Sequence, residues 1–422
     1  MSSDQLLTAP VKNQLSLSDR LKPKHWARAA IRKNLASMRR GQLILEENGE
    51  KTVYGDLSED VSLVAELTII DDAMYSAVAF NGVVGAGESY MEGYWTSPDL
   101  VKVIRFFVIN MQSLDALDNQ RSWLSRIGMR VLDRVNRNTI LRAQKNISAH
   151  YDLGNDFFSL FLDQSMMYSS AVFNDDSACL YDASTAKLET ICQQLKLNAN
   201  DHLLEIGTGW GSMAIYAAQN FGCRVTTTTI SKEQYEYALE RVTALGLNDK
   251  VTVLMEDYRK LTGRYDKLVS IEMIEAVGRQ YFSEYFGRCA DLLKPNGLML
   301  IQAITIADQR YEQATRAVDF IQRYIFPGGC LPSVNIIGHH VASDTDMMIV
   351  SLKDIGRDYA LTLERWREQF MDKLETVRSQ GFDERFIRMW EYYLCYCEGG
   401  FRERAISTVQ VVMAKPEYRA VL

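Results

Sequence analysis

The sequence predicts an α/β protein in which a doubly wound parallel sheet follows a smaller N-terminal α+β domain. Three observations lead to this prediction. The 422 residues exceed one ordinary core, 47% of them are hydrophobic, and short apolar runs alternate with helical patterns from His202 onward. So large an apolar fraction excludes a disordered chain, because it is enough for packed cores.

The second half of the chain carries the strand and helix signals. The expected strands are residues 202–206, 224–230, 251–255, 265–270 and 298–304. The expected helices are residues 212–220, 231–245 and 280–292. Ser231 is the candidate N-cap of the second helix, because a serine hydroxyl can accept a hydrogen bond from a first-turn amide. Such alternation is typical of parallel sheets whose crossover connections are helices.

The first 130 residues have a mixed pattern, which predicts the small α+β domain. Residues 52–57 and 61–70 alternate like strands, and residues 98–117 have the apolar spacing of a helix. We expect a basic linker helix at residues 131–150 and a second domain at residues 151–422.

Basic residues gather in two runs, although the formal net charge is −7. Residues 20–40 contain eight Lys or Arg and no acid, and residues 121–145 contain seven and one acid. Solvated helix faces are one explanation. The other is an anionic membrane surface, where each cation contributes on the order of 1 kcal/mol. The second run also has amphipathic spacing, which fits packing on the core or lying on lipid headgroups. The acidic chain as a whole argues against nucleic acid as a partner.

Targeting signals and metal motifs are weak in this sequence. The start of the chain lacks the basic and apolar regions of a signal peptide, and no apolar run approaches the ~18 residues that cross a bilayer. Seven cysteines lie mostly far apart without a C-x-x-C pair, which favours reduced thiols over disulfides or a metal site. We therefore expect a cytoplasmic protein, peripherally associated with the inner face of the cell membrane.

A glycine-rich turn joins the strand at 202–206 to the next helix. It contains Glu205, Gly207, Thr208, Gly209, Trp210 and Gly211. Glycines let the backbone approach a ligand, and the N-terminus of the following helix faces it. The G-x-G-x-G spacing after an acid differs from the G-x-G-x-x-G of dinucleotide sites and is the arrangement of S-adenosylmethionine-dependent methyltransferases. A purely structural turn is the alternative.

Three positions at later strand ends are candidates for the nucleoside part of that cofactor. Asp257 can accept a hydrogen bond from an adenine amino group, or it can cap a helix. Thr229 and Gln234 are neutral candidates for the ribose, at a strand end where many cofactor sites place an acid.

Residues 150–413 resemble the cyclopropane-fatty-acyl-phospholipid synthases and the related mycolic acid cyclopropane synthases. The motifs are HYDLGNDFF (150–158), MYSSAVF (167–173), LEIGTGWGS (204–212), TISKEQ (229–234), EDYR (256–259), SIEMIEAVG (270–278), YIFPGGCLPS (324–333) and FRERAISTVQVV (401–412). The N-terminal part also looks like the long bacterial form of the synthase. The resemblance implies a Rossmann-like methyltransferase domain, a lipid-binding N-terminal domain and a homodimer.

The resemblance also implies the reaction. Such enzymes add the methyl carbon of S-adenosylmethionine to a cis double bond of a phospholipid acyl chain in the membrane. Loss of a proton from the added methyl group closes a cyclopropane ring, so the site needs an apolar slot, exclusion of water and a base. In this family the base looks to be a bound bicarbonate ion.

The positions that match the bicarbonate pocket depart from the family pattern in part. They are Ser170, Glu275, Gln302, the backbone of Ile304, and Tyr359. Ser170 stands where Cys is common and Gln302 where His is common, while Ala276 replaces a frequent His. Ser and Gln can still donate hydrogen bonds to an anion. With these changes a methylene or methyl-branched product is the alternative to a ring.

The resemblance assigns Tyr168 and Ser169 to the cofactor, and Tyr258 follows Asp257 in the same motif. The residues also have plain structural interpretations. Glu275 could pair with a buried arginine, Tyr359 could be a core aromatic residue and Ser169 a turn residue. Two other function classes stay open, a methyltransferase for a soluble small molecule and a lipid-binding protein without catalysis.

Overall fold

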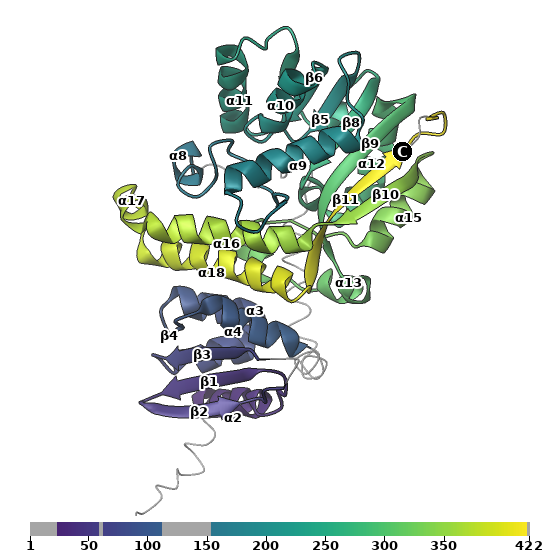
Figure 1. The fold of residues 1–422 in the computed structure, drawn as a ribbon. Coiled ribbons are helices and arrows are strands. Elements are labelled where there is room, and N and C mark those ends of the chain that lie inside the picture. Colours follow the sequence, from purple (N-terminus) through teal and green to yellow (C-terminus); the bar gives the residue numbers. More distant parts are fainter. Residues whose placement is uncertain (1–22, 59–61, 112–152, 420–422) are drawn as a thin grey trace, which may run out of the picture.

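The computed structural model describes residues 23–58, 62–111 and 153–419, which form two domains stacked end to end (Figure 1). The predicted linker helix at 131–150 and the basic run at 121–145 lie outside the described residues. In the described ranges, no helix is long and apolar enough to cross a membrane.

In its described residues, the N-terminal domain has a four-stranded sheet and three helices, as the α+β prediction requires. Its strands are β1 (Gln42–Glu47), β2 (Glu50–Tyr54), β3 (Val64–Ile69) and β4 (Trp95–Thr96), in the order β2-β1-β3-β4. Its helices are α2 (Pro23–Leu35), α3 (Ala73–Met91) and α4 (Leu100–Ile109). Side chains of β1 and β3 alternate in burial, which is the pattern of strands with one face on a core. The sequence analysis found β2, β3 and α4 and missed β1, β4 and α3.

The first basic run is not a uniform charged surface. Arg28 and Arg32 of α2 both donate to the carboxylate of Glu47, which is buried, with a distance of 2.8 Å from Arg28 Nη2. Arg39 and Arg40 are exposed. The expectation of a solvated or membrane-facing run therefore fails for Arg28 and Arg32, because a buried carboxylate holds both.

The second domain contains a seven-stranded sheet. Its strands are β5 (His202–Ile206), β6 (Arg224–Thr229), β7 (Val251–Met255), β8 (Tyr265–Ile271), β9 (Leu293–Ile306), β10 (Met348–Asp354) and β11 (Ile406–Ala414). The order is β10-β11-β9-β8-β5-β6-β7. The five strands β5 to β9 are parallel to one another, as predicted, whereas β11 runs antiparallel to both β9 and β10. The sheet is therefore mixed, and its parallel part is the doubly wound half.

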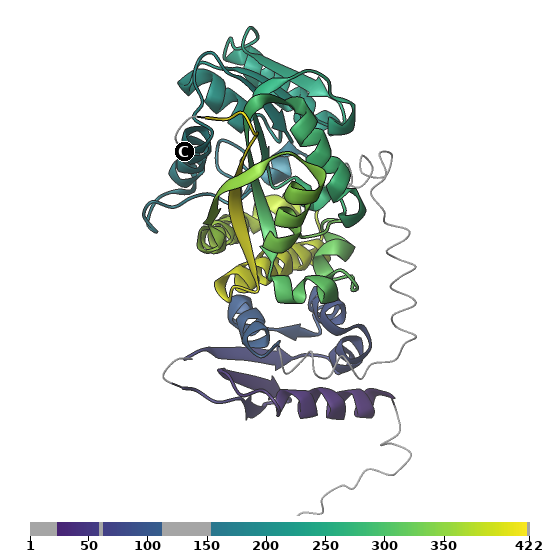
Figure 2. The ribbon, with the colours of Figure 1, turned by 90° about the vertical axis from the view of Figure 1, so that its right-hand side faces the viewer.

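Helices cover both faces of this sheet, and some of them lie on the side of the N-terminal domain. They are α8 (Asn155–Phe158), α9 (Leu180–Gln194), α10 (Ser212–Asn220), α11 (Lys232–Ala244), α12 (Phe282–Leu292), α13 (Asp308–Ala314), α14 (Phe320–Tyr324), α15 (Val334–Asp344), α16 (Gly356–Asp372), α17 (Leu374–Ser379) and α18 (Glu384–Arg402). Ser231 caps α11 as predicted, since its hydroxyl oxygen accepts from the Gln234 amide. In both views α16 and α18 lie between the large sheet and the N-terminal domain (Figure 1, Figure 2).

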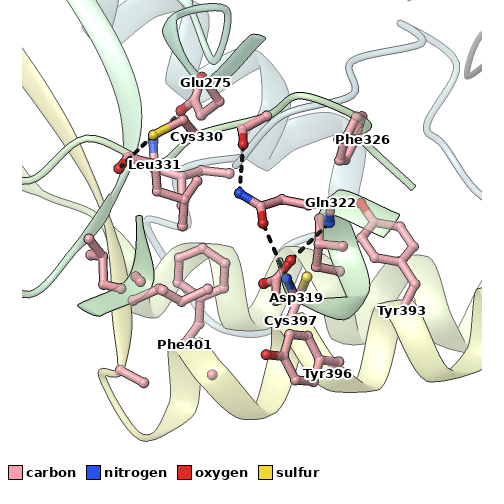
Figure 3. A pocket seen from close by; sticks show the side chains of 18 of the residues that line it. Glu275, Asp319, Gln322, Phe326, Cys330, Leu331, Tyr393, Tyr396, Cys397 and Phe401 are labelled. Atoms are coloured by element: carbon pink, nitrogen blue, oxygen red, sulfur yellow. Dashed lines mark hydrogen bonds between the residues drawn. The ribbon is translucent and has the colours of Figure 1, made fainter. Parts of the chain in front are cut away.

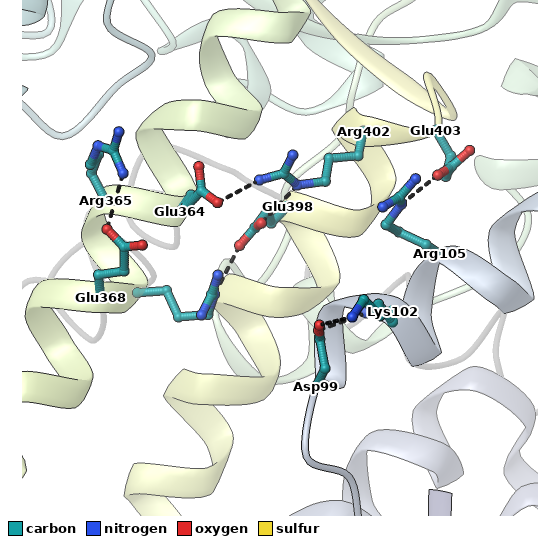
Figure 4. Close-up of polar contacts among 10 residues, drawn as sticks. Asp99, Lys102, Arg105, Glu364, Arg365, Glu368, Glu398, Arg402 and Glu403 are labelled. Atoms are coloured by element: carbon teal, nitrogen blue, oxygen red, sulfur yellow. Dashed lines mark hydrogen bonds and ion pairs between the residues drawn. The ribbon is translucent and has the colours of Figure 1, made fainter. Parts of the chain in front are cut away.

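Helix α18 ties the two domains together. The buried Glu398 carboxylate accepts hydrogen bonds from Arg367 of α16 at 2.9 Å and from Arg402 at 2.8 Å. Arg105 of α4 donates to Glu403, just after α18, at 2.5 Å (Figure 4). Because two arginines share one buried acid, α16 and α18 form one wall, and α4 is attached to its end.

Candidate active site

A cavity of about 1250 Å³ runs from the second domain into the N-terminal domain. At one end it is lined by the glycine turn after β5, and at the other by residues of α2 and α3. Between these ends it passes Glu272, Glu275 and Tyr359. One continuous space therefore joins the predicted cofactor site to the domain boundary.

The glycine turn has the backbone shape that only glycine adopts readily. Gly207, Gly209 and Gly211 have φ values of 99°, 53° and 89°, all in the left-handed region that a Cβ atom disfavours. A Cβ on Gly207 would lie 3.2 Å from Cγ of Met273. The turn therefore brings bare backbone to the cavity, as a cofactor cradle requires.

Glu205 lies beneath this turn and is buried. Its carboxylate accepts from the Thr227 hydroxyl at 2.6 Å, and the Thr227 oxygen is 2.6 Å from the Thr208 oxygen. Burial raises the pKa of Glu205 to about 8. Trp210 donates its ring N–H to Asn155 at 2.6 Å, so α8 is fastened to the turn.

The nucleoside candidates meet at the ends of β6 and β7 and line the same cavity, together with Tyr258. The Thr229 hydroxyl donates to Gln234 Oε1 at 2.9 Å. Asp257 accepts from the backbone and the guanidinium of Arg259, at 3.0, 2.8 and 2.6 Å, and caps the short helix Tyr258–Lys260. The capping interpretation of Asp257 is therefore confirmed.

Tyr168 and Ser169 are held by partners that the sequence analysis did not name. The hydroxyl oxygens of Tyr168 and Tyr393 are 2.9 Å apart. Ser169 accepts from the Lys187 ammonium at 2.6 Å. Lys187 is fully buried, and burial lowers its pKa to about 8 although the carboxylate of Glu272 opposes this. Ser169 thus anchors a buried cation and is more than a turn residue.

The predicted anion pocket is centred on a residue that was not singled out, Glu272. Its Oε1 accepts from the Ser170 backbone N–H at 2.9 Å and from Gln302 Nε2 at 2.8 Å. Its Oε2 accepts from the Tyr359 hydroxyl at 2.8 Å. The Ser170 hydroxyl donates to the Ala171 carbonyl at 3.0 Å, so the group of Ser170 that bonds with Glu272 is its backbone N–H.

Gln302 and Tyr359 both donate to Glu272, and Tyr359 also lines the cavity. Gln302 is fully buried, and its Oε1 accepts from Gln410 Nε2 at 3.0 Å. The amide therefore has partners on both sides, as a buried amide needs. Tyr359 also stacks on Phe401, with ring centroids 4.5 Å apart, so it is both a packed aromatic residue and a hydrogen-bond donor to the site.

Glu275 is the second carboxyl group of the pocket. Its Oε1 accepts from the Ile304 backbone N–H at 2.5 Å, while its buried Oε2 has no hydrogen-bond partner among the residues that the structure describes. Burial and the nearby charge of Glu272 raise its pKa to about 8. Within the described ranges no arginine pairs with Glu275, so the alternative interpretation of Glu275 as the partner of a buried arginine is not met there.

Beyond Glu275 the cavity becomes aromatic (Figure 3). The close-up labels Phe326, Tyr393, Tyr396, Cys397 and Phe401, most of them from α18, around the space. In the same view Gln322 bonds with Asp319, and this pair forms a capping box that starts α14. The wall is therefore mostly apolar, and Asp319 and Gln322 satisfy each other through the capping box.

The sequence itself indicated that Glu272 is a candidate functional residue, but the motif positions matched to the family included only Glu275. Glu272 and Glu275 stand three residues apart in the apolar run SIEMIEAV, directly at the end of β8. Two acids in such a run are costly to bury unless each is satisfied. Lys187 and Gln410 gave no such signal, because one lies in an ordinary helical pattern and the other in a strand.

Comparison with known proteins identifies a family and several relatives that this chain resembles. Residues 139–411 match the family model described as mycolic acid cyclopropane synthetase. The chain is 38% identical over 346 residues to the tuberculostearic acid methyltransferase of Mycobacterium tuberculosis, covering 80% of each chain. It is 36% identical over 358 residues to the cyclopropane-fatty-acyl-phospholipid synthase of Escherichia coli, covering 84% of this chain and 89% of that one.

A solved structure with the same fold is a cyclopropane synthase from Mycobacterium tuberculosis. It aligns with a TM-score of 0.61 at 27% identity and covers 64% of this chain and 98% of its own. A second cyclopropane synthase structure, in complex with S-adenosylhomocysteine (SAH), aligns with a TM-score of 0.61 at 28% identity.

Proposed function

This chain belongs to the mycolic acid cyclopropane synthetase family, and we propose that it transfers the methyl carbon of S-adenosylmethionine to a cis double bond in a phospholipid acyl chain, forming a cyclopropane ring. The observation that carries this proposal is the single cavity that joins the glycine turn to an aromatic slot at the domain boundary. At about 1250 Å³ it exceeds the range of roughly 300–1,000 Å³ typical of small-molecule sites. Because this volume includes the cofactor end, it is the extension of the cavity past the aromatic slot to Trp26 and Phe80 that favours a long acyl substrate over a soluble small molecule.

The cofactor site in this proposal is the carboxyl end of β5, β6 and β7. The residues that would hold S-adenosylmethionine are Tyr168, Ser169, Glu205, Gly207, Thr208, Gly209, Trp210, Gly211, Thr229, Gln234, Asp257 and Tyr258. The left-handed glycines support this fit, since any side chain would be strained at these positions and one at Gly207 would press on Met273, which lines the cavity. When bound, S-adenosylmethionine supplies an electrophilic methyl group, and the aromatic wall beyond Glu275 keeps water from the alkene that receives it.

The second requirement is a route for a membrane lipid, and the N-terminal domain supports one. Trp26 and Phe80 line the cavity yet are 58% and 61% exposed, and their ring centroids are 6.3 Å apart. Val83 beside them is 51% exposed. Apolar side chains that line a cavity and also face solvent suit contact with a bilayer. We therefore assign residues 1–130 to lipid binding and residues 151–422 to catalysis.

The charge pattern supports an anionic membrane surface as the place of work. Lys33, Arg39 and Arg40 are exposed on the N-terminal domain, which also carries Trp26 and Phe80. Cations beside apolar side chains are the usual composition of a peripheral membrane contact. A cytoplasmic homodimer that binds the inner face of the membrane is the arrangement we propose.

A methylene or methyl-branched product is the second candidate. It is supported by the relative named tuberculostearic acid methyltransferase, whose name gives methyl transfer and no ring. Both products begin with the same methyl transfer. Loss of a proton from the added methyl group closes the ring directly, whereas a 1,2-hydride shift before that loss gives a methylene branch, which only a separate reductant would turn into a saturated methyl branch. The timing of proton removal by the base therefore decides between the ring and the methylene branch.

Product analysis tests the proposal. Purified protein, S-adenosylmethionine and vesicles of a cis-unsaturated phospholipid should give acyl chains heavier by one methylene unit in mass spectrometry. Ring protons in the NMR spectrum of the product would identify the cyclopropane, and alkene protons of a methylene branch would favour the second candidate. Unchanged acyl chains at every salt concentration would refute both.

A further inference from the structure

Glu272 has a backbone conformation that is unusual for a residue with a side chain. Its φ is 48°, in the left-handed region that side chains rarely adopt. It lies just after β8, where its amide donates to the Gln302 carbonyl at 2.7 Å. A strained residue at a cavity is typical of a functional group held in place by its surroundings. This strain directs the Glu272 carboxylate into the centre of the predicted anion pocket.

The donors that the resemblance assigns to bicarbonate are already used by this carboxylate. The Ser170 N–H, the Gln302 amide and the Tyr359 hydroxyl all donate to Glu272, at 2.8 to 2.9 Å. The remaining members of the pocket, Glu275 and Ile304, bond to each other. An additional bicarbonate ion would find its donors taken and two carboxyl groups beside it, which repel an anion. The residues present therefore do not fit a bound bicarbonate.

We propose that the Glu272 carboxylate is the base of this enzyme and replaces the bicarbonate ion that its family resemblance implies. The inference rests on the proposed function. After methyl transfer, one C–H bond of the added methyl group breaks and its electron pair forms the C–C bond that closes the ring. The proton goes to a Glu272 oxygen. Glu272 lines the cavity between the glycine turn and the acyl slot, where the methyl group arrives.

The second layer of contacts suits a fixed carboxylate. Gln194 donates to Gln410 at 2.7 Å, and Gln410 donates to Gln302 Oε1 at 3.0 Å. Because Oε1 of Gln302 is an acceptor in this chain, its Nε2 must face Glu272 as a donor. An amide donates at every pH, whereas a neutral histidine has one donor and one acceptor nitrogen. The change from His to Gln at this position is therefore what a built-in carboxylate requires.

Charge and burial also support the role. Lys187 is buried nearby, and its charge favours the ionised form of Glu272. Burial acts in the opposite direction and is the larger effect, so the pKa of Glu272 is raised above that of a free glutamate. A base with a raised pKa accepts a proton more readily near neutral pH.

Two variants of Glu272 distinguish a base that is the Glu272 side chain from a base that is a bound bicarbonate ion. Glu272→Gln keeps the size and removes the charge, while Glu272→Gly opens a space lined by the same three donors. Glycine adopts a φ of 48° without strain, so this variant should fold. Glu368→Gln, an exposed acid of α16, is the matched control. Turnover is measured in buffer freed of carbon dioxide and again with added bicarbonate, and binding of isotope-labelled bicarbonate is followed by NMR.

We expect wild-type turnover to be independent of bicarbonate, and Glu272→Gln to lose about 100-fold or more in either buffer. Added bicarbonate should bind to Glu272→Gly and raise its turnover by about 10-fold or more, because the ion fills the vacant pocket. The wild-type protein should give no binding signal.

Three outcomes would overturn the inference. They are labelled bicarbonate bound to the wild-type protein, wild-type turnover that needs bicarbonate, and turnover of Glu272→Gln within about twofold of the control. Absence of any lipid product from the wild type would instead refute the proposed function, and the binding measurement on the wild type and Glu272→Gly would still test the pocket.

Discussion

The cofactor end and the acyl end of the cavity are built in different ways. At the cofactor end, the glycine turn, Thr229 and Asp257 follow neighbouring parallel strands, so each lies within a few residues of a strand that the sequence predicts. At the acyl end, α18 meets α3 and α4 of another domain. The difference shows that strand-end chemistry is encoded locally, whereas an apolar slot is encoded by packing between distant segments.

The largest effect is expected from filling the acyl end alone. Cys397→Trp places a large ring in the slot beside Phe401, and turnover of lipid should fall by about 100-fold or more because the alkene is displaced from the methyl donor. Affinity for S-adenosylmethionine, measured by calorimetry, should change by less than about twofold. Cys397→Ala is the control and should stay active. Equal losses of both quantities would mean that the two ends are not separate.

The converse change acts on the cofactor end. Gly207→Ala puts a Cβ at a φ of 99° and 3.2 Å from Met273 Cγ, a strain of about 1–3 kcal/mol. Affinity for S-adenosylmethionine should fall by about 10- to 100-fold. Gly246→Ala is the matched control, since Gly246 also has a positive φ of 65° but nothing lies within 4 Å of its added Cβ. Similar cofactor affinity in both variants would contradict the cradle.

Turnover should depend on pH through Glu272, which lies between the cofactor end and the acyl end. Glu272 must be ionised to accept a proton, and burial raises its pKa, so turnover should be lost as pH falls through a window above the ordinary value of 4.5. The titratable groups that surround it are Lys187 of α9, Tyr359 of α16 and Glu275. Lys187→Met removes the charge that favours ionised Glu272, so the acidic limb of kcat/KM should move to higher pH.

Lys232→Met is the control for this shift, because Lys232 lies on the exposed side of α11. An acidic limb that stays in place, or moves to lower pH, in Lys187→Met would argue against the ionised Glu272 carboxylate.

Prediction from the sequence was accurate for local features at the cofactor end and less accurate for features that depend on contacts between distant segments. The ends of β5 and β7 and the cap at Ser231 were predicted correctly, because hydrophobic periodicity and capping are local signals. The five-residue anion pocket was predicted from family resemblance, and its members do come together. Its centre was missed, because the partners of Glu272 lie as far as 102 residues away in the chain. The helix α3 was missed because its three glycines and three valines have low helix propensity, and packing against α18 supports it instead.

The smallest effect is expected at the outer surface of the N-terminal domain. Binding to vesicles that contain anionic phospholipid should weaken as salt rises. Arg39→Gln removes one exposed cation, worth on the order of 1 kcal/mol at such a surface, and should weaken binding by about fivefold at low salt. Lys232→Gln on the second domain should leave binding unchanged. Binding that ignores salt would remove the electrostatic role and leave Trp26 and Phe80 as the whole contact.

The shared walls of the cavity make substrate occupancy and domain association linked equilibria. Tyr90 of α3 donates to Glu391 of α18 at 2.7 Å, and Arg385 pairs with Glu92 at 2.7 Å. With the Arg105–Glu403 pair described above, these polar contacts hold the boundary together with packing. A ligand that touches both walls stabilises the docked arrangement by RT ln(1 + [L]/Kd). Reciprocally, loosening the boundary lowers affinity for the acyl chain. Substitutions at Tyr90 or Glu92, which are remote from any reacting atom, should therefore raise KM and leave kcat nearly unchanged. Product release should be coupled to a small separation of the two domains.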